Sequence, residues 1–299
     1  MIQVNNVHKR FESRTILQDV TFAVGKGEVV GLLGPNGAGK TTMIRLMNGV
    51  IAPDGGSVLI HGLDPAAGGN EIRRRSGVVT ESAGLYPDMS ARDNLRFFAK
   101  LYGCGGDRQR MEELLEQFRL AEHGDKPVGS YSTGMKKRLA IAKALLHRPE
   151  LLFLDEPTNG LDPEGIRDMI GFLKRLNAEE GTTILICSHV LYQLEEVCTA
   201  YLFLERGRII EQGRLRELEE TYMQHVVLHV ETGLRTEENR IGRYAFERVG
   251  ENRLQFLLPS KAEIPELLKQ LLGVSWVHSA EIANRDLESI YFEVRRRAV

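Results

Sequence analysis

The 299-residue sequence has few cysteines and no long apolar run. Three cysteines, Cys104, Cys187 and Cys198, are too few to form a disulfide framework in a chain of this length. The longest apolar runs, such as VVGLL and LLFL, fall far short of the roughly 20 residues that a membrane-spanning helix requires. The first residues, MIQVNNVHKRF, lack the apolar core of a secretion signal. We therefore expect a reduced, cytosolic compartment.

An excess of charge of one sign is also missing. Lys and Arg number 39 and Asp and Glu number 41, so the formal net charge is -2 and the pI is near 6.5. Proteins that bind nucleic acid irrespective of sequence normally carry a strong basic excess. We therefore expect no nucleic-acid partner, although the composition leaves room for a local basic patch. The length predicts about two domains.

Short β-rich segments alternate with longer helical patterns over residues 1–215, which predicts an α/β domain with a mainly parallel sheet. Strands are expected at residues 28–33, 57–61, 151–155, 183–187 and 201–205. Two of them, LLFLD and TILIC, are apolar without alternation, which is typical of central strands covered on both faces. The apolar spacing between residues 90 and 120 predicts two amphipathic helices. We place them in a helical subdomain over about residues 84–145.

The pattern changes after about residue 211. Near residues 211–221, the segment GRLRELEETY reads as a short helix that acts as a linker. Behind it lie expected strands at residues 225–230, 243–248 and 253–258, a helix at 262–272 and two further segments at 274–282 and 287–294. This order predicts a second, small α+β domain over residues 216–299, with one or two helices on a small sheet.

The segment GPNGAGKTT, which begins at Gly34, fits the phosphate-binding pattern GxxxxGK[ST]. It lies between an expected strand and an expected helix at residues 43–48, where glycines let backbone N–H groups surround phosphates. Lys40 supplies a cation for the β- and γ-phosphates, and the Thr41 hydroxyl is a hard oxygen ligand suited to Mg²⁺. The alternative is an ordinary glycine-rich turn, which does not explain the flanking elements. The residues expected to contact nucleotide here are Gly34, Asn36, Gly37, Ala38, Gly39, Lys40, Thr41 and Thr42.

Two adjacent carboxylates, Asp155 and Glu156, follow the apolar run LLFL at the end of a central strand, where α/β sheets bind ligands. Asp155 suits Mg²⁺, and Glu156 suits the polarisation of an attacking water. The alternative is an acidic cap before Pro157, which the nearby phosphate loop disfavours. His189 ends the next expected strand at the same edge. We expect its neutral imidazole to contact the γ-phosphate, rather than to be an ordinary surface or core histidine.

The segment YSTGM at residues 131–135 precedes a helical pattern at 136–147. Ser132 is a good N-cap, and with Gly134 it leaves helix-terminal N–H groups that can bind an anion. By itself this is only a capped amphipathic helix. It stands, however, about twenty residues before LLFLDE, and that order of motifs decides the family.

The ordered set resembles the nucleotide-binding subunit of an ATP-binding cassette (ABC) transporter, whose fold is a P-loop NTPase core with an antiparallel β part. GPNGAGKTT resembles its Walker A motif, YSTGM its LSGGQ signature, LLFLDEP its Walker B motif and NGLD, which ends at Asp162, its D-loop. His189 is similar to the switch histidine. Phe11 matches the aromatic residue that stacks on adenine, the alternative being a core phenylalanine. The tail after residue 220 resembles the C-terminal extension of bacterial exporter-type subunits.

Two departures from the family pattern stand out. In GVVTESAGLY, Glu81 occupies the position of the Q-loop glutamine. A carboxylate is therefore expected to contact Mg²⁺ there. The alternative is that Glu81 is solvated and that the contact lies at Ser82. The signature reads STGM rather than SGGQ, so Thr133 adds a Cβ and a hydroxyl near the phosphate. Because Ser132 and Gly134 keep the main donors, we expect function to be retained.

The resemblance implies a Mg²⁺-dependent ATPase with Glu156, His189 and Lys40 as catalytic residues, Thr41, Glu81 and Asp155 as metal ligands, and nucleotide contacts from Ser132, Gly134 and Asp162. It also implies a head-to-tail dimer, most simply a homodimer, that powers a separate integral membrane permease from the cytoplasmic face, for export. The segment 84–103, with Leu85, Tyr86, Phe97 and Phe98, is the expected permease contact. The alternatives are an ABC ATPase that acts on nucleic acid or ribosomes, and a P-loop kinase, which leaves YSTGM and NGLD unexplained.

Overall fold

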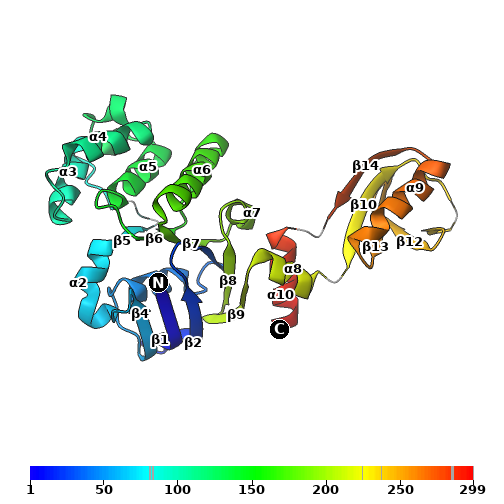
Figure 1. Cartoon of the computed structure of the whole chain (residues 1–299), viewed down its shortest axis with the longest axis horizontal. Coiled ribbons are helices and arrows are strands. Elements are labelled where there is room, and N and C mark those ends of the chain that lie inside the picture. Colours follow the sequence, from blue (N-terminus) through cyan, green and yellow to red (C-terminus); the bar gives the residue numbers. More distant parts are fainter. Residues whose placement is uncertain (81, 83, 224, 237, 284–285, 299) are drawn as a thin grey trace. The chain divides into compact units, whose positions relative to one another are not determined.

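The computed structural model describes residues 1–80, 82, 84–223, 225–236, 238–283 and 286–298. The chain divides into two compact units, Met1–Gln212 and Gly213–Val299. Figure 1 draws both of them, and each unit has its own sheet and its own apolar core.

The first unit is built on a six-stranded sheet of order β5-β6-β7-β3-β8-β9. Its strands are Ser76–Val79 (β5), Leu151–Asp155 (β6), Thr183–Ser188 (β7), Val29–Leu33 (β3), Ala200–Glu205 (β8) and Arg208–Gly213 (β9). The pairs from β5 to β8 are all parallel. Every residue of β3, β6 and β7 is buried, as the unbroken apolar runs require of central strands. The predicted α/β fold with a mainly parallel sheet is confirmed.

A three-stranded antiparallel sheet of order β2-β1-β4 adjoins this core. Its strands are Ile2–Phe11 (β1), Arg14–Val24 (β2) and Gly55–Ile60 (β4). The sequence pattern singled out β4 but neither β1 nor β2. The reason lies in the register, which shifts after Val4, Val7 and Lys9 and so breaks the period-two alternation that identifies a half-buried strand.

Seven helices of the first unit are described: Lys40–Met47 (α1), Pro65–Arg75 (α2), Ala91–Leu101 (α3), Arg108–Gln117 (α4), Thr133–Ala144 (α5), Pro163–Glu180 (α6) and Leu191–Glu195 (α7). The two amphipathic helices expected between residues 90 and 120 are present as α3 and α4. These helices and α5 gather on one side of the unit, above the antiparallel sheet in Figure 1. Single 3₁₀ turns, Ala121–His123 and Val128–Ser130, lead from α4 to α5.

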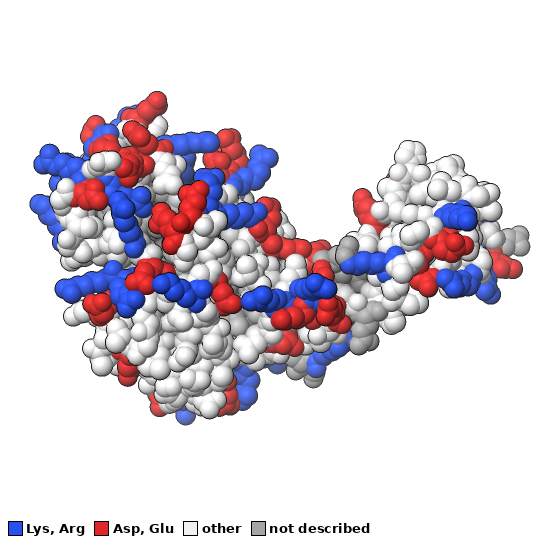
Figure 2. All heavy atoms as spheres, viewed as in Figure 1, with Lys and Arg blue, Asp and Glu red and all other residues white. Residues whose placement is uncertain are grey.

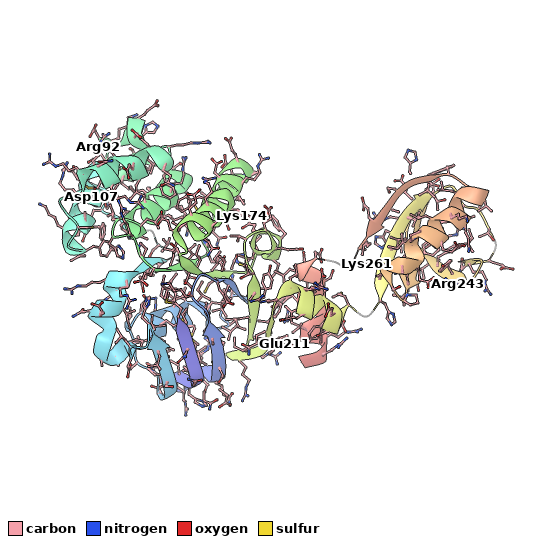
Figure 3. All side chains as sticks on the ribbon, viewed as in Figure 1. Arg92, Asp107, Lys174, Glu211, Arg243 and Lys261 are labelled. Carbon is pink, nitrogen blue, oxygen red and sulfur yellow. The ribbon has the colours of Figure 1, made fainter. Side chains whose placement is uncertain are left out.

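The second unit has a five-stranded sheet of order β11-β12-β13-β10-β14. The strands are Arg240–Ile241 (β11), Tyr244–Arg248 (β12), Arg253–Leu258 (β13), Val226–Thr232 (β10) and Val277–Ile282 (β14), and the helices are Leu215–Tyr222 (α8), Ile264–Val274 (α9) and Leu287–Ala298 (α10). Leu267 and Leu271 of α9 pack on the sheet residues Leu228 and Phe256. Figure 3 marks Arg243 at the start of β12, where Arg243 and Tyr244 both bind Glu263.

The described helices include none that is long and apolar enough to cross a membrane. Figure 2 shows basic and acidic side chains interspersed over the visible face of the first unit. This mixture agrees with the formal net charge of -2.

Candidate functional site

The phosphate-loop segment lies between the end of β3 at Leu33 and the start of α1 at Lys40. Two of its glycines are required by close approach. A Cβ on Gly34 would lie 2.2 Å from the carbonyl oxygen of Leu204, and one on Gly39, whose φ is 113°, would lie 2.6 Å from Cδ2 of Leu17. Only glycine fits these two positions. The loop therefore folds tightly against β8 and β2, and α1 starts directly from it.

An open hollow of about 400 Å³ lies at the carboxyl ends of β3, β6 and β7. This is the edge at which parallel sheets bind ligands. Its lining residues are Arg14, Ile16, Asn36, Gly37, Gly39, Lys40, Thr41, Thr42, Asp155, Glu156, Asn159 and His189. Gly34 and Ala38 lie beneath it: the Gly34 carbonyl accepts a hydrogen bond from Lys40, and Ala38 is buried.

The charged groups of the hollow are joined by hydrogen bonds and an ion pair. Lys40 Nζ donates to the carbonyl oxygens of Gly34 at 2.7 Å and Pro35 at 3.2 Å, and it lies 3.8 Å from Oε1 of Glu156. The Thr41 hydroxyl donates to Oδ2 of Asp155 at 2.7 Å. A hydroxyl and a carboxylate side by side are hard oxygen donors of the kind that Mg²⁺ takes, together with water and substrate phosphate. These two residues therefore fit a bound Mg²⁺.

Glu156 is held from several sides. Its backbone has a left-handed φ of 50°, which is rare outside glycine and typical of functional sites, and its N–H donates to the Cys187 carbonyl at 2.9 Å. Oε1 lies 2.9 Å from Nδ1 of His189, and Oε2 accepts from the Ser188 hydroxyl at 3.2 Å. This carboxylate is buried, so these contacts and the nearby Lys40 compensate its desolvation.

Cys187 lies under the site but takes no part in its chemistry. Burial, reinforced by the neighbouring Asp155 carboxylate, raises the pKa of the Cys187 thiol well above its usual value. A thiol that stays protonated is a poor nucleophile and a poor metal ligand. Cys187 therefore acts as a core side chain of β7.

The signature segment forms a second hollow, of about 540 Å³. Its lining residues are Arg119, Ser132, Thr133, Gly134, Arg138, Gly160, Leu161, Asp162, Glu164, Gly165 and Asp168. Ser132 caps α5 by accepting from the N–H of Met135 at 3.2 Å, and Asp162 caps α6 by accepting from the N–H of Gly165 at 3.0 Å. Two helix N-termini thus border one hollow.

Thr133, whose Cβ and hydroxyl the sequence predicts near the phosphate, packs its methyl group against Gly160. A Cβ built on Gly160 would lie 2.7 Å from Cγ2 of Thr133, so the absent side chain of Gly160 makes room for that methyl group. The signature segment is therefore fitted to the segment that ends at Asp162.

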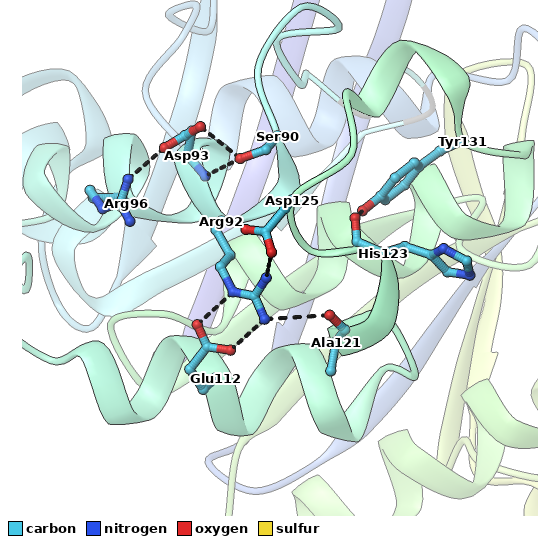
Figure 4. A network of polar contacts seen from close by, with 9 residues as sticks. All are labelled: Ser90, Arg92, Asp93, Arg96, Glu112, Ala121, His123, Asp125 and Tyr131. Carbon is cyan, nitrogen blue, oxygen red and sulfur yellow. Dashed lines mark hydrogen bonds and ion pairs between the residues drawn. The ribbon is translucent and has the colours of Figure 1, made fainter.

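A network of polar contacts leads to Tyr131, the first residue of the signature segment (Figure 4). Arg92 binds Glu112 through Nε at 2.9 Å and Nη2 at 3.1 Å, and Asp125 through Nη1 at 2.6 Å. These two carboxylates raise the pKa of the Arg92 guanidinium. The Tyr131 hydroxyl donates to the His123 carbonyl at 2.6 Å. Arg92 thus ties α3, α4 and the 121–125 turn together, and that turn holds the residue before Ser132.

The structure brings some of the expected site residues together and not others. Lys40, Thr41, Asp155, Glu156 and His189 share the first hollow, whereas Ser132, Gly134 and Asp162 line the second. Phe11 does not belong to the lining of the first hollow. It ends β1 with an exposed ring, 5.3 Å from Lys9 Nζ, and its ladder partner Arg14 does line the hollow. Glu81 lies outside the described residues.

Sequence reasoning missed several residues of the site. Arg14 and Ile16 line the hollow from β2, a strand that the pattern did not reveal, and Ser188 binds Glu156. The only signal for Arg14 and Ile16 was their closeness in sequence to Phe11. For Ser188 it was the position next to His189 at a strand end.

Known proteins resemble this chain closely. The family model described as "ABC transporter" matches residues 17–159. The ABC transporter ATP-binding protein YdbJ of Bacillus subtilis is 33% identical over 91% of this chain and 88% of its own length. The daunorubicin resistance ATP-binding protein DrrA2 of Streptomyces coeruleorubidus is 34% identical over 92% of this chain and 77% of its own length. Among solved structures, the dimeric ATP-binding cassette MJ0796 bound to ADP and Pi aligns with a TM-score of 0.66 and 26% identity, over 72% of this chain and 99% of the other.

Proposed function

This chain belongs to the ATP-binding subunits of ABC transporters, and from that premise we propose that it hydrolyses ATP, with Mg²⁺, as one half of a dimer that drives a separate membrane permease. The observation that carries the proposal is the buried Glu156 carboxylate, which shares one hollow with Lys40 and with the Thr41–Asp155 pair.

The chemistry follows from those positions. Backbone N–H groups of the phosphate loop and Lys40 hold the β- and γ-phosphates. Thr41 and Asp155 would hold Mg²⁺, which would neutralise phosphate charge. Glu156 accepts the proton of the attacking water. His189, beside Glu156, contacts the γ-phosphate. Glu81, at the Q-loop position, remains a sequence-based proposal for a further Mg²⁺ ligand.

The two separate hollows support a dimer. Because Ser132, Gly134 and Asp162 line a different hollow from Lys40, one chain does not enclose a nucleotide between them. A second copy, placed head to tail, supplies its signature segment to the phosphate loop of the first copy and completes two equivalent sites. MJ0796, with which this chain aligns, is dimeric in its solved structure.

We further propose that the permease is an exporter and that the subunit works at the cytoplasmic face of the membrane. The resistance protein DrrA2 among the relatives supports export. The contact is assigned to residues 84–103, where Tyr86 and Phe97 are 47% and 40% exposed and their ring centroids lie 5.0 Å apart. Exposed aromatic residues that pack on each other favour a protein interface.

The division of labour proposed along the chain assigns nucleotide chemistry to residues 1–215, with the helical subdomain at about 84–145, and an accessory role to residues 216–299. The second unit has an apolar core of its own around Leu228, Phe256 and Leu271. We assign to it regulation or stabilisation of the dimer.

The test of the ATPase uses Glu156→Gln, which keeps the shape of the side chain and removes the proton acceptor. The variant is expected to bind MgATP, to hydrolyse it at least about 100-fold more slowly and to elute as an ATP-bound dimer in size-exclusion chromatography. Glu195→Gln, a substitution in α7 outside the lining of the hollow, serves as the matched control. Near-normal turnover of Glu156→Gln would place the base elsewhere.

The permease contact is tested separately by co-purification of the tagged chain with integral membrane proteins. Tyr86→Glu is expected to abolish co-purification while basal ATPase activity and the circular dichroism spectrum stay unchanged. Lys174→Glu, which alters an exposed side chain on α6, is the control. Loss of fold in Tyr86→Glu would assign the ring to the core.

A further inference from the structure

A third, smaller hollow of about 170 Å³ lies between the end of α4, the middle of α5 and one face of α6. Gly171 and Arg175 of α6 line it together with Phe172. Phe118, at the end of α4, and Arg138 of α5 line the opposite side. An occupant would therefore touch α6, the end of α4 and α5, whose N-terminus carries the signature segment.

The inner wall of this hollow is aromatic. Phe118 and Phe172 pack edge to face with ring centroids 4.8 Å apart, and each ring is only 5% exposed. Met169, also buried, lines the same wall. Such a wall suits a small flat or aliphatic group rather than a hydrated ion.

The outer part of the hollow is strongly basic. Arg119 is paired with Glu164 at 3.3 Å and Asp168 at 3.1 Å. The guanidinium groups of Arg138, Arg167 and Arg175, in contrast, have no hydrogen bond or ion pair with any described residue, and all three side chains line the hollow. Arg138 is half-buried, whereas Arg167 and Arg175 are exposed and hydrated, and Asp168 is an acidic residue in the same lining. The guanidinium groups of Arg138, Arg167 and Arg175 are therefore available to pair with an anion.

Gly171 has no side chain and so leaves space in the hollow. It lies one turn before Arg175, and a Cβ built on Gly171 would lie 3.6 Å from Nη1 of Arg175. The Arg175 guanidinium therefore lies next to the bare backbone at Gly171, at the edge of the hollow, where it stays exposed to solvent. A larger side chain at position 171 would fill the space that an occupant needs.

We propose that this hollow binds a small organic anion, with one carboxylate or phosphate group held by Arg138 and Arg175 and a short apolar body against Phe118 and Phe172. The volume limits the occupant to a molecule much smaller than the usual drug-sized ligand. Guanidinium groups bind carboxylate and phosphate through paired N–H donors, so both head groups fit. The site adjoins the signature hollow, with which it shares Arg138, and its occupant would regulate nucleotide binding by tying α5 to α6.

The neighbouring signature hollow shares Arg119, Arg138, Gly165 and Asp168 with this one, so the test must tell them apart. Arg175, Gly171 and Phe172 line only the proposed site, and Ser132 lines only the signature hollow. Substitutions at these positions separate the two.

The experiment titrates the full chain, free of nucleotide, with benzoate, with phenyl phosphate and with neutral benzamide, and follows binding by saturation-transfer NMR and thermal shift. Benzoate and benzamide share a ring, so only the charge differs. We expect benzoate or phenyl phosphate to bind and benzamide not to bind. The stronger of the two anions identifies the head group.

Four variants decide the location. Arg175→Ala is expected to raise the dissociation constant of the bound anion about tenfold. Gly171→Leu is expected to abolish binding, whereas Gly171→Ala, whose methyl group meets only an ordinary contact, and Ser132→Ala leave it unchanged. Equal binding of benzamide, absence of binding by both anions, or an effect of Ser132→Ala with none of Arg175→Ala would overturn the proposal.

Discussion

Oε1 of Glu156 lies 2.9 Å from Nδ1 of His189, while the other carboxylate oxygen accepts from Ser188 at 3.2 Å. An ionised Glu156 requires a proton on Nδ1 of the ring, so Nε2 accepts in the neutral imidazole and donates only in the imidazolium. The sequence analysis expected a neutral imidazole at the γ-phosphate. That expectation stays a prediction: a neutral ring with its proton on Nδ1 would accept at Nε2, and donation from Nε2 to a phosphate oxygen would require the charged ring.

Replacement of His189 by alanine is expected to lower kcat for ATP about 100-fold and to leave ATP affinity nearly unchanged, because the ring orients Glu156 and is not needed for the phosphate-loop contacts. Steady-state kinetics and calorimetry measure the two quantities. Ser188→Ala, which removes the other contact to Glu156, should have a smaller effect. Unaltered kcat in His189→Ala would remove the ring from the mechanism.

Lys40→Ala is expected to weaken ATP binding about tenfold or more, because it deletes a charge-assisted contact to phosphate. The ammonium group already points into the hollow, 3.8 Å from Glu156. Calorimetry checks the prediction, with the exposed Lys174→Ala as control; Figure 3 marks that lysine. Equal affinities in Lys40→Ala and Lys174→Ala would contradict the role of Lys40.

The parts of the fold that the sequence predicted best are those with a continuous pattern. The run LLFLD gave the bounds of β6 because a central parallel strand is apolar at every position. The segment 287–294 could not be assigned from its pattern and is the helix α10. In the segment expected at 274–282, the strand β14 starts only at Val277, because α9 continues to Val274.

The site residues that could be predicted are likewise those in continuous sequence motifs. Motifs fixed by chemistry, such as Lys40 with Thr41 and Asp155 with Glu156, could be found because they are contiguous in sequence. Partners that meet only through folding could not. Tertiary packing alone brings Arg14 to the phosphate loop and joins Thr133 to Gly160.

Arg92→Lys is expected to loosen the signature segment although it keeps the charge. A lysine cannot reproduce the two bonds to Glu112 together with the bond to Asp125, and the loss should cost about 1 kcal/mol of stability. Hydrogen exchange should rise in residues 121–131. Arg96→Lys, at an exposed pair with Asp93 in Figure 4, is the control, and equal exchange in both variants would count against the network.

A chain that ends at Gln212 should fold and bind ATP as the full chain does, because the first unit contains every described residue of the nucleotide hollow. Circular dichroism and calorimetry test this directly. If the soluble fragment fails to bind ATP, the second unit is part of the site and its accessory role is wrong.

The last prediction concerns Lys143, a buried lysine on α5. Its Nζ donates to the Gly84 carbonyl at 3.2 Å and lies 4.8 Å from the centre of the Phe98 ring. Burial lowers the pKa of Lys143 to about 8 from the ordinary value of 10.5. Between these two pH values the unfolded chain binds more protons at this residue than the folded chain does, so the contribution of Lys143 to stability rises with pH. Below pH 8 the folded protein keeps a charged ammonium group in a poorly solvated place.

Lys143→Met removes that charge and keeps the aliphatic volume. At pH 7 the free energy of unfolding of the variant should exceed that of the wild type, and the difference should shrink by roughly 2–3 kcal/mol on going to pH 10. Urea unfolding at both pH values measures it, with the exposed Lys100→Met on α3 as the control for general charge effects. A difference that is the same at pH 7 and pH 10 would show that Lys143 keeps an ordinary pKa, because only a group that titrates differently in the folded and unfolded chains makes stability depend on pH.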